Sequence, residues 1–569
     1  MTGNSPPPSP TVHDRSRDFP WLNAFTLVSA CLAVYLPVFF RMPLSRAEAM
    51  YALIPKEMLA SGSWLTPLLN GVPYLDKPQL LYWLNLLSYK VFGVSDWAAR
   101  VPTLALALGE VWFTYLVGLR LVGRRAAWLG GFVLFSCIGF FSLHLQIFTD
   151  HLITLTLAAS MYFLLRWMEG PAFRWSAAFF ICLAAGFLSK GFIGLVFPLF
   201  ISLLFAWRIR QRHLLSLVFS TKGLIVAAVL LAPWFVGVEL AHPGFLKFQI
   251  VNEQIMRFLG KRQPSDIVSF SIFGFWLFLA IWLMPWTLLL PEALYRFWAE
   301  TGPAGSEDPR GRLLMVWPAV ILSFFTLSGS RIEYYSLPAF PPLALVLGWR
   351  LRSYLARGGP SLSYALAGLS LLGLSTIFLL PYLEQVCAAN RREFCGMFDL
   401  ILPVAKPVTW LVPILALAGA LVGWLRSRRL AVACYGALAL ALVYFAFAAL
   451  MAITPLVSDQ LPGELVKSRA GPDDLLVMEQ IEEYEYGASL AFYAGRTILM
   501  VKRHGLPQFP YPVPPQENYL ISPEQLRQLW QGDRRVFLLL DDATKPEPFL
   551  QGAIVARALP GKRLLTNRP

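Results

Sequence analysis

Long apolar runs separated by short polar joints dominate the chain as far as Ala452. Few or no charged residues interrupt segments such as Trp21–Phe40, Phe270–Leu290, Ser361–Leu380 and Leu430–Ala452. Each approaches or exceeds the roughly 20 residues that an α-helix needs to cross a hydrocarbon layer. The pattern therefore predicts membrane-spanning helices rather than the buried helices of a soluble protein.

The joints between these runs carry arginines, which is typical of cytoplasmic loops in membrane proteins. They are Arg120–Arg125, Arg166–Arg174, Arg208–Arg212, Arg310–Arg312, Arg350–Arg357 and Arg426–Arg429. Placing every joint in the cytoplasm gives about 13 crossings, with the two ends of the chain on opposite sides. Residues 1–20, which are polar and rich in Pro and Ser, then form a cytoplasmic tail. Three long polar stretches face outward: Arg41–Trp97, Ala241–Ile267 and everything after about Ile453.

The first outward stretch, residues 41–97, is too long and too patterned to be a simple connection. Apolar residues recur at helical spacing within Glu48–Ala60, and Gln79–Phe92 is mostly apolar but too short to span. Both segments predict helices that lie in the membrane interface.

The composition changes after Ile453, where Asp, Glu, Pro and Gly return. Short runs typical of strands are Leu475–Met478, Ile498–Val501 and Val536–Leu540. Turn residues bound these runs, and Pro523–Gln531 has a helical pattern, as in a small α/β domain. The predicted fold is an all-α polytopic membrane domain, residues 21–452, followed by a periplasmic α/β domain, residues 453–569.

Composition narrows the function. Hydrophobic residues make up 56% of the chain and charged residues 14%, and the mean hydropathy is +0.56, which excludes an ordinary soluble protein. The formal net charge is +14. A nucleic-acid partner is not expected, because the basic residues punctuate apolar spans instead of forming a polar face; anionic membrane lipids fit better. Walker loops, glycine-rich dinucleotide turns and Cys-x-x-Cys pairs are absent, so nucleotide use is not indicated.

The six cysteines fall into two groups. Four lie inside apolar spans and are expected to be buried thiols: Cys31, Cys137, Cys182 and Cys434. Cys387 and Cys395 instead flank the polar loop Ala388–Phe394. A disulfide between them requires an oxidising compartment, and the topology above places this loop outside.

Charged residues beside membrane spans are costly unless they are paired or used, so each one is a candidate for a functional site. The outward set is Glu48, Asp76, Lys77, Asp150, Lys190, Glu253, Arg257, Arg331 and Glu333. Its basic members suit a phosphate, and its carboxylates suit a proton taken from a hydroxyl.

Structural explanations compete with these roles. Glu48 could solvate an interfacial helix, and Asp150 could sit favourably at a helix N-terminus. Lys190 could extend along an apolar span to reach water, while Asp76-Lys77 and Glu253/Arg257 could be plain ion pairs. The three histidines His144, His151 and His242 lack metal-ligand spacing, which favours structural roles. The sequence therefore assigns no metal ligand and no cofactor, and leaves a divalent metal open.

Several segments resemble, in order, the bacterial lipid-to-lipid sugar transferases typified by the lipid A aminoarabinose transferase. These enzymes are relatives of the protein O-mannosyltransferases in the GT-C class. The similar segments are Glu48–Met58, Ala60–Asn85, Thr149–Leu155, Leu188–Pro198, His242–Leu259, Arg331–Leu345 and Ser489–Arg496. The most specific is ASGSWLTPLLNGVPYLDKPQLLYWLN, Ala60–Asn85.

The resemblance implies an inverting glycosyltransferase that uses an undecaprenyl-phosphate sugar at the periplasmic face of a bacterial inner membrane. Lys77 and Arg257 would bind the donor phosphate with Lys190 nearby, and Asp150 would sit at the catalytic centre. The pocket would be lined by Tyr51, Tyr74, Asp76, Glu253 and Tyr335. The acceptor would be lipid A or a related glycolipid, with protein or polysaccharide as the alternative, and the enzyme would be a monomer.

Two positions depart from the family pattern. The first-loop motif usually begins Asp-Glu and continues to an Arg before Tyr-Ala, whereas this chain has Ala47, Glu48 and Met50. Either Glu48 serves as the base from the adjacent position or the acceptor chemistry differs. The family's histidine before Arg257 is Gln254 here, which weakens a metal or acid–base role at that position.

A transporter or a non-catalytic lipid-binding relative is the further alternative. A transporter would place charges between spans at mid-membrane, and one built from inverted repeats would show two similar halves. The charged candidates cluster instead at the outward ends of the spans. The sequence therefore favours the transferase.

Overall fold

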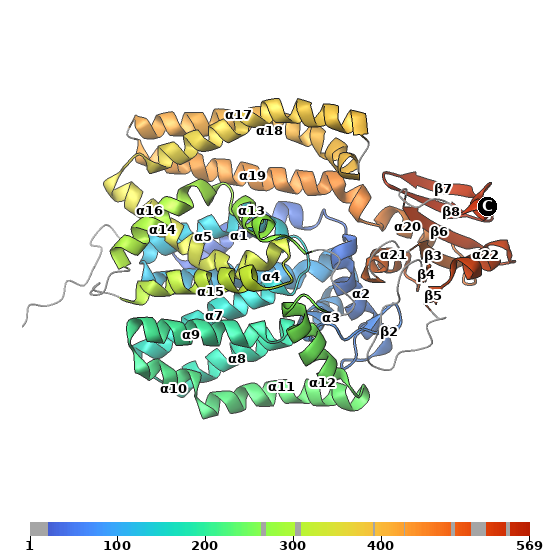
Figure 1. The fold of residues 1–569 in the computed structure, drawn as a ribbon, viewed down its shortest axis with the longest axis horizontal. Coiled ribbons are helices and arrows are strands. Elements are labelled where there is room, and N and C mark those ends of the chain that lie inside the picture. Colours follow the sequence, from blue (N-terminus) through green and yellow to red (C-terminus); the bar gives the residue numbers. More distant parts are fainter. Residues whose placement is uncertain are drawn as a thin grey trace, which may run out of the picture.

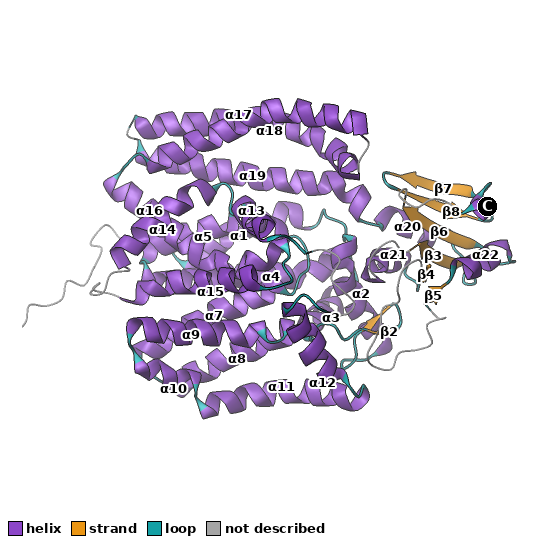
Figure 2. Ribbon diagram, viewed as in Figure 1, coloured by secondary structure: helices purple, strands orange, loops and turns teal. Residues whose placement is uncertain are grey.

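The protein is described by a computed structural model. It covers residues 21–262, 269–301, 309–390, 393–425, 427–479, 484–501, 519–541 and 547–569. The predicted cytoplasmic tail, residues 1–20, lies outside the described residues. Long helices run side by side through most of the molecule, and a sheet lies at one end of them (Figures 1 and 2).

Eight helical segments are long and apolar enough to cross a membrane. They are α4 (Asp96–Leu121), α7 (Asp150–Glu169), α8 (Phe173–Lys190), Arg212–Ala241 ending in α11 (Thr221–Ala241), Pro309–Leu327 containing α15 (Leu313–Leu327), α17 (Ser361–Asn390), α18 (Glu393–Trp424) and α19 (Arg428–Val457). Their outer sides carry bare apolar side chains, such as Leu240 and Phe378, which are 78% and 80% exposed. Lipid is the solvent that suits such a surface, and the chain is a multi-pass membrane protein.

Two bent pairs of helices are further candidate spans. The first pair bends by 60° and the second by 102°: α5 (Arg124–Phe135) with α6 (Ile138–His144), and α13 (Ile272–Trp282) with Trp286–Thr301, which contains α14 (Leu290–Thr301). Shorter apolar helices are α1 (Ala24–Phe39) and α9 (Ile193–Ile209). Adding α16 (Phe340–Arg357) to these eight segments, two pairs and two short helices gives thirteen units in the described chain. Between eight and ten of these units are long and apolar enough to cross a membrane, so the roughly 13 crossings expected from the sequence stay a prediction.

Small residues let α5 and α16 pack backbone against backbone. A Cβ atom added to Gly348 would come within 2.3 Å of the Gly130 amide nitrogen. A Cβ on Gly130 would lie 3.0 Å from the Ala344 carbonyl oxygen. Close approach of this kind is how helices gain packing energy where the surrounding lipid offers no hydrophobic driving force.

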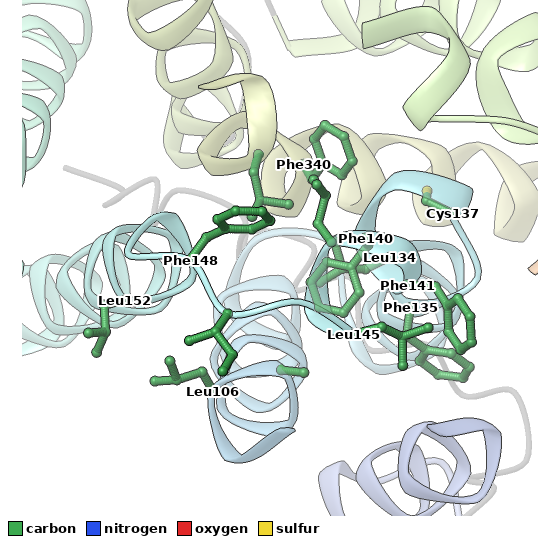
Figure 3. Close-up of a cluster of buried hydrophobic side chains, with 14 of the residues drawn as sticks. Leu106, Leu134, Phe135, Cys137, Phe140, Phe141, Leu145, Phe148, Leu152 and Phe340 are labelled. Atoms are coloured by element: carbon green, nitrogen blue, oxygen red, sulfur yellow. The ribbon is translucent and has the colours of Figure 1, made fainter. Parts of the chain in front are cut away.

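A buried apolar core fills the space between α4, α6 and α7. Figure 3 shows Leu106, Phe140, Leu145, Phe148 and Leu152 gathered there. All of these side chains are less than a tenth exposed. The core fixes the short segment between α6 and α7 that leads into Asp150.

The outward segments form a layer between the helices and the sheet (Figure 1). Its elements are α2 (Arg46–Ser61), β1 (Leu68–Leu69), β2 (Val72–Pro73), α3 (Leu80–Phe92), α12 (Phe245–Lys247), the π-helix η2 (Phe248–Met256) and the 3-10 helix η5 (Glu333–Ala339). The two expected helices are present, but α2 is mostly buried rather than laid on a lipid surface. Lys56 donates to the Phe492 carbonyl at 2.8 Å, and Asn70 donates to the Ile498 carbonyl at 2.8 Å. The C-terminal domain therefore covers α2.

The C-terminal domain contains a six-stranded mixed sheet among the described residues. Its strand order is β5-β4-β3-β6-β8-β7, parallel from β5 to β6 and antiparallel from β6 to β7. The strands are β3 (Leu475–Glu479), β4 (Leu499–Val501), β5 (Leu520–Ile521), β6 (Val536–Asp541), β7 (Ile554–Leu559) and β8 (Lys562–Thr566). The helical segments are α20 (Gln460–Arg469), η6 (Tyr484–Gly487), α21 (Ala488–Ala494), α22 (Pro523–Gln531) and η8 (Pro548–Leu550). The three predicted strands and the helix at Pro523–Gln531 are confirmed.

Buried charges attach this domain to the layer beneath it. Arg46 at the start of α2 donates to Asp459 at 2.9 Å and to Asp541 at 3.1 Å, and Lys562 donates to Asp459 at 2.7 Å. Burial raises the pKa of Asp459, but Arg46 and Lys562 outweigh it and hold the pKa below its usual value. The carboxylate therefore stays ionised inside the interface.

The Cys387–Cys395 disulfide is present, as the sequence suggested. It joins the adjoining ends of α17 and α18, on the same side of the molecule as the C-terminal domain (Figure 1). This position agrees with the outward placement of the loop.

Candidate functional site

A cavity of about 540 Å³ lies where the outward layer meets the ends of α8 and α15. Its lining combines charged residues with aromatic ones. The residues are Asp76, Lys77, Pro78, Lys190, Ile193, Gln249, Glu253, Gln254, Arg257, Phe258, Phe324, Phe325, Ser328, Ser330 and Tyr335. The structure thus gathers six of the predicted site residues around one space, although they come from four distant parts of the chain.

Glu253 is the anionic centre of the cavity. Its carboxylate accepts from Arg257 at 2.7 Å and from Arg262 at 2.7 Å, and lies 3.6 Å from the Lys77 ammonium nitrogen. Burial alone would raise the pKa of Glu253, but the three cations outweigh it and lower the pKa to about 2. Glu253 is therefore ionised and holds these cations together.

The adjacent pair Asp76 and Lys77 is buried with its charges facing the same centre. Burial and the neighbouring Glu253 raise the pKa of Asp76 to about 6, against the opposing effect of Arg262, which donates to it at 2.6 Å. Burial and the neighbouring Arg257 lower the pKa of Lys77 to about 8, against Glu253. A further anion beside Lys77 would favour its ammonium form and so raise its pKa.

Lys190 connects the cavity to Asp150. Its ammonium group donates to both carboxylate oxygens of Asp150, at 2.7 and 2.6 Å, and lies 4.2 Å from the centre of the Tyr335 ring. Asp150 begins α7 and its side chain is only 3% exposed. It does not line the cavity itself but stands directly behind Lys190.

Gln254 packs against the tight turn that follows Lys190. Gly191 adopts φ +77, and a Cβ there would meet the Gln254 amide at 2.3 Å. Gln254 accepts from the Phe192 amide at 3.0 Å. Gln254 therefore supports the backbone that presents Lys190.

Residues 76–236 match the family described as dolichyl-phosphate-mannose-protein mannosyltransferase. The undecaprenyl phosphate-alpha-4-amino-4-deoxy-L-arabinose arabinosyl transferase of Aeromonas salmonicida is 31% identical over 340 residues, which is 56% of this chain and 59% of that enzyme. The enzyme of the same name from Proteus mirabilis is 25% identical over 549 residues, 91% of each chain.

The solved structures extend the match to the whole fold. ArnT from Cupriavidus metallidurans bound to undecaprenyl phosphate superposes with a TM-score of 0.78 at 20% identity, covering 96% of this chain and 98% of that one. Its apo form gives 0.76. The chain has the ArnT fold. The resemblance to aminoarabinose transferases and the GT-C fold class are thereby confirmed.

Glu48, predicted as a catalytic residue, lies outside the cavity. Its fully buried carboxylate accepts from Arg100 at 2.6 Å, from the Ser45 amide at 2.9 Å and from the Ile147 amide at 3.0 Å. The sequence could not reveal this, because the charge that engages Glu48 lies 52 residues away.

Two predicted pocket tyrosines also lie outside the cavity lining. Tyr51 is buried on α2 and hydrogen-bonds with Thr149, the residue before Asp150; burial and the Asp150 charge raise the pKa of its phenol. Tyr74 donates to Glu485 of the C-terminal domain at 2.8 Å. Tyr51 thus borders the Asp150 side of the site, and Tyr74 links the first outward loop to the domain above it.

Sequence reasoning missed two features. Arg262 bridges Asp76 and Glu253, and its position five residues after Arg257 in an outward stretch was a usable signal. Glu110, His144 and His151 bring their ligand atoms within 4.8 Å of one another. No spacing rule finds this cluster, because its members come from three different helices.

Proposed function

We propose that the chain is an inverting glycosyltransferase that moves a sugar from an undecaprenyl-phosphate donor to a glycolipid of the lipid A type. The observation that carries the proposal is the convergence of Lys77, Arg257 and Lys190 on one outward cavity, with Asp150 behind Lys190. The curated relatives, named for undecaprenyl phosphate and aminoarabinose, support the same class of donor. In the alignment with the Aeromonas relative only 59% of that enzyme's length is matched.

The charges around the cavity favour a phosphate. Four cations, Lys77, Lys190, Arg257 and Arg262, face three carboxylates, Asp76, Asp150 and Glu253. One positive charge is therefore left in excess within this group. A phosphate monoester or diester bound beside Lys77 and Arg257 would neutralise it and accept charge-assisted hydrogen bonds.

An apolar groove beside the cavity suits a polyprenyl chain. Its volume is about 680 Å³, and it lies between α8, α11 and η2. Its lining includes Phe187, Phe235 and Ile250, and it shares Gln249 and Gln254 with the charged cavity. One amphipathic molecule can therefore place its phosphate in the cavity and its hydrocarbon in the groove.

The reaction requires one displacement. An acceptor hydroxyl oxygen attacks the anomeric carbon from the face opposite the phosphate, and the bond from that carbon to the phosphate oxygen breaks. The electron pair stays on the departing polyprenyl phosphate, where Lys77, Arg257 and Lys190 stabilise it. In this structure both Asp150 oxygens are bound to Lys190. Asp150 therefore takes the hydroxyl proton once the donor phosphate has drawn Lys190 away and freed the carboxylate to reach the acceptor. A single displacement inverts the anomeric configuration, and no sugar becomes attached to the protein.

The remaining predicted residues have supporting roles. Glu253 and Asp76 hold the cations in place, and Tyr335 packs against Lys190. Glu48 fixes the loop before Asp150 through the Ile147 amide, instead of acting as the base. Tyr51 borders Asp150 from the same side.

Location and acceptor complete the proposal. The disulfide and the Arg-bearing joints support a bacterial inner membrane protein whose cavity faces the periplasm. Protein or polysaccharide is the second candidate acceptor, favoured by the match to a protein mannosyltransferase family. We expect a monomer without nucleic-acid partners.

The test is a product assay with purified protein in lipid nanodiscs. Undecaprenyl-phosphate aminoarabinose and lipid A are supplied together, and mass spectrometry follows both lipids. We expect lipid A to gain one sugar while undecaprenyl phosphate is released. Release without sugar on lipid A, but with sugar on an added protein or polysaccharide, would move the acceptor to the second candidate. No turnover of any polyprenyl-phosphate sugar by the folded protein would overturn the proposal.

A further inference from the structure

Glu110, His144 and His151 form a closed polar cluster inside the helical bundle. Glu110 lies in the middle of α4, His144 ends α6, and His151 is the second residue of α7. The three side chains are at most 1% exposed. Their ligand atoms lie within 4.8 Å of one another, and the sugar-transfer chemistry does not use them.

Each histidine is oriented by a backbone carbonyl. His144 Nδ1 lies 2.7 Å from the Phe140 carbonyl oxygen, and His151 Nε2 lies 3.1 Å from the Gln146 carbonyl oxygen. Since a carbonyl oxygen only accepts, both of these nitrogens carry hydrogen. In the neutral rings, His144 Nε2 and His151 Nδ1 then hold lone pairs. A ring fixed through one N–H so that its other nitrogen can ligate is the usual arrangement around protein-bound metals.

The polar atoms inside the cluster are incompletely satisfied. His144 Nε2 lies 2.9 Å from Glu110 Oε1, so two acceptors face each other unless a proton or a cation joins them. A single shared proton would satisfy only that pair. Glu110 Oε2 and His151 Nδ1 would still lack hydrogen-bond partners among the described residues, at a considerable cost for buried groups. One multivalent cation would satisfy all of these atoms.

We propose that Glu110, His144 and His151 bind one divalent first-row transition ion of the Zn²⁺ type. Two imidazole nitrogens and a carboxylate oxygen are a donor set that such ions accept, whereas Mg²⁺ and Ca²⁺ prefer oxygen ligands throughout. Apolar rings lie beside both histidines: the Phe140 ring centre is 4.1 Å from that of His144, and the Phe148 ring centre is 6.1 Å from that of His151. Both phenylalanines belong to the buried apolar cluster shown in Figure 3. This shell would exclude competing water and strengthen the ion's hold on its ligands.

The ion would act as a positioning centre for the neighbouring site. His151 directly follows Asp150, so an ion held by α4, α6 and α7 fixes the first turn of α7. Asp150 then meets Lys190 in a defined orientation. The binding proposal itself does not depend on sugar transfer, because it can be tested by metal content alone.

The experiment uses the full chain, purified through an affinity tag without histidines. The protein is treated with a chelator, incubated with Zn²⁺ and freed of excess ion, and zinc per chain is measured by mass spectrometry. We expect one zinc per wild-type chain and none in Glu110→Gln or His151→Gln. His213→Gln, which changes an exposed histidine, is the matched control and should keep the zinc. Full occupancy in Glu110→Gln, or no binding by the wild type, would overturn the site.

A second measurement on the wild type guards against misfolded variants. X-ray absorption at the zinc edge reports the ligands directly, and we expect two imidazoles with the remaining ligands oxygen or nitrogen. Sulfur ligands, or a shell of oxygen alone, would contradict the assignment. Zinc should also raise the thermal unfolding temperature of the wild type and of His213→Gln, but not that of Glu110→Gln.

Discussion

Lys77 can hold a phosphate only while its ammonium group is protonated. Because burial and Arg257 lower its pKa to about 8, the cationic form prevails below that pH and is lost above it. We expect kcat/KM for the free enzyme to fall as the pH rises through about 8. In Lys77→Arg this decline should disappear, since a guanidinium stays charged over the whole range. A flat wild-type profile well above pH 8 would contradict the role of Lys77.

Removal of the phosphate cations should have a large effect. Lys77→Ala and Arg257→Ala each delete a donor that stabilises the departing phosphate, and the loss of such a donor costs about 10²- to 10³-fold in rate. The exposed residues Lys222 and Arg429 provide matched controls as Lys222→Ala and Arg429→Ala. Equal product formation by all four variants would remove the phosphate site.

Asp150 and Glu48 are tested as the general base by different measurements: kcat for Asp150, and thermal unfolding with the pH–rate profile for Glu48. Asp150→Asn keeps the side-chain shape, so we expect the donor to bind while kcat drops about 10²-fold or more. The exposed Asp473 gives the matched control Asp473→Asn. Wild-type kcat in Asp150→Asn would exclude it as the base.

Glu48→Gln should act mainly on stability. The substitution leaves Arg100, which is 1% exposed, without its counter-charge, and breaking a buried pair in this way costs about 3 to 5 kcal/mol. We expect a lower unfolding temperature but an unchanged shape of the pH–rate profile. The exposed control Glu524→Gln should change neither. Loss of the acidic limb of the profile in Glu48→Gln, at normal stability, would instead make Glu48 the base.

At the scale of helices and strands, the close packing of α5 against α16 stabilises the bundle that holds the site. Gly348→Ala forces α16 away from α5, because the new Cβ would lie 2.3 Å from the Gly130 nitrogen. We expect a loss of about 1 to 3 kcal/mol, typical of overpacking, measured by thermal unfolding in detergent. Gly170→Ala is the control, since a Cβ there meets nothing within 4 Å. Equal unfolding temperatures for the two variants would show that the helices separate at no cost.

Sequence patterns predicted most helices and strands, because each of these depends on residues that lie close together in the sequence. Apolar length located the spans, and short apolar runs bounded by turn residues located β3, β4 and β6. The interfacial character expected for α2 was only partly correct, because the domain that covers it follows some 400 residues later in the chain, as the Lys56–Phe492 contact illustrates. Burial by a distant domain leaves no periodic signal in the segment that it covers.

At the scale of the whole molecule, the functional site was likewise predicted only in part. Motif residues such as Lys77, Lys190 and Glu253 do line one cavity, which a family pattern can anticipate. The pairing of Glu48 with Arg100, and the meeting of Glu110 with two histidines, depend on contacts between helices far apart in sequence. Those contacts decide whether a buried carboxylate faces a substrate, an arginine or a metal.

Contacts between polar side chains attach the C-terminal domain to the outward layer beneath it. Arg46 joins the first turn of α2 to Asp459 and Asp541, and Tyr74 joins the cavity loop to Glu485. Arg46→Met keeps the apolar stem but removes both ion pairs, so we expect faster deuterium uptake in α20 and β6 while the membrane helices stay protected. The control Arg534→Ala changes an exposed arginine of the same domain. Unchanged exchange in Arg46→Met would mean that apolar packing alone holds the domain, whereas faster exchange with reduced transfer would tie the position of the domain to the cavity beneath it.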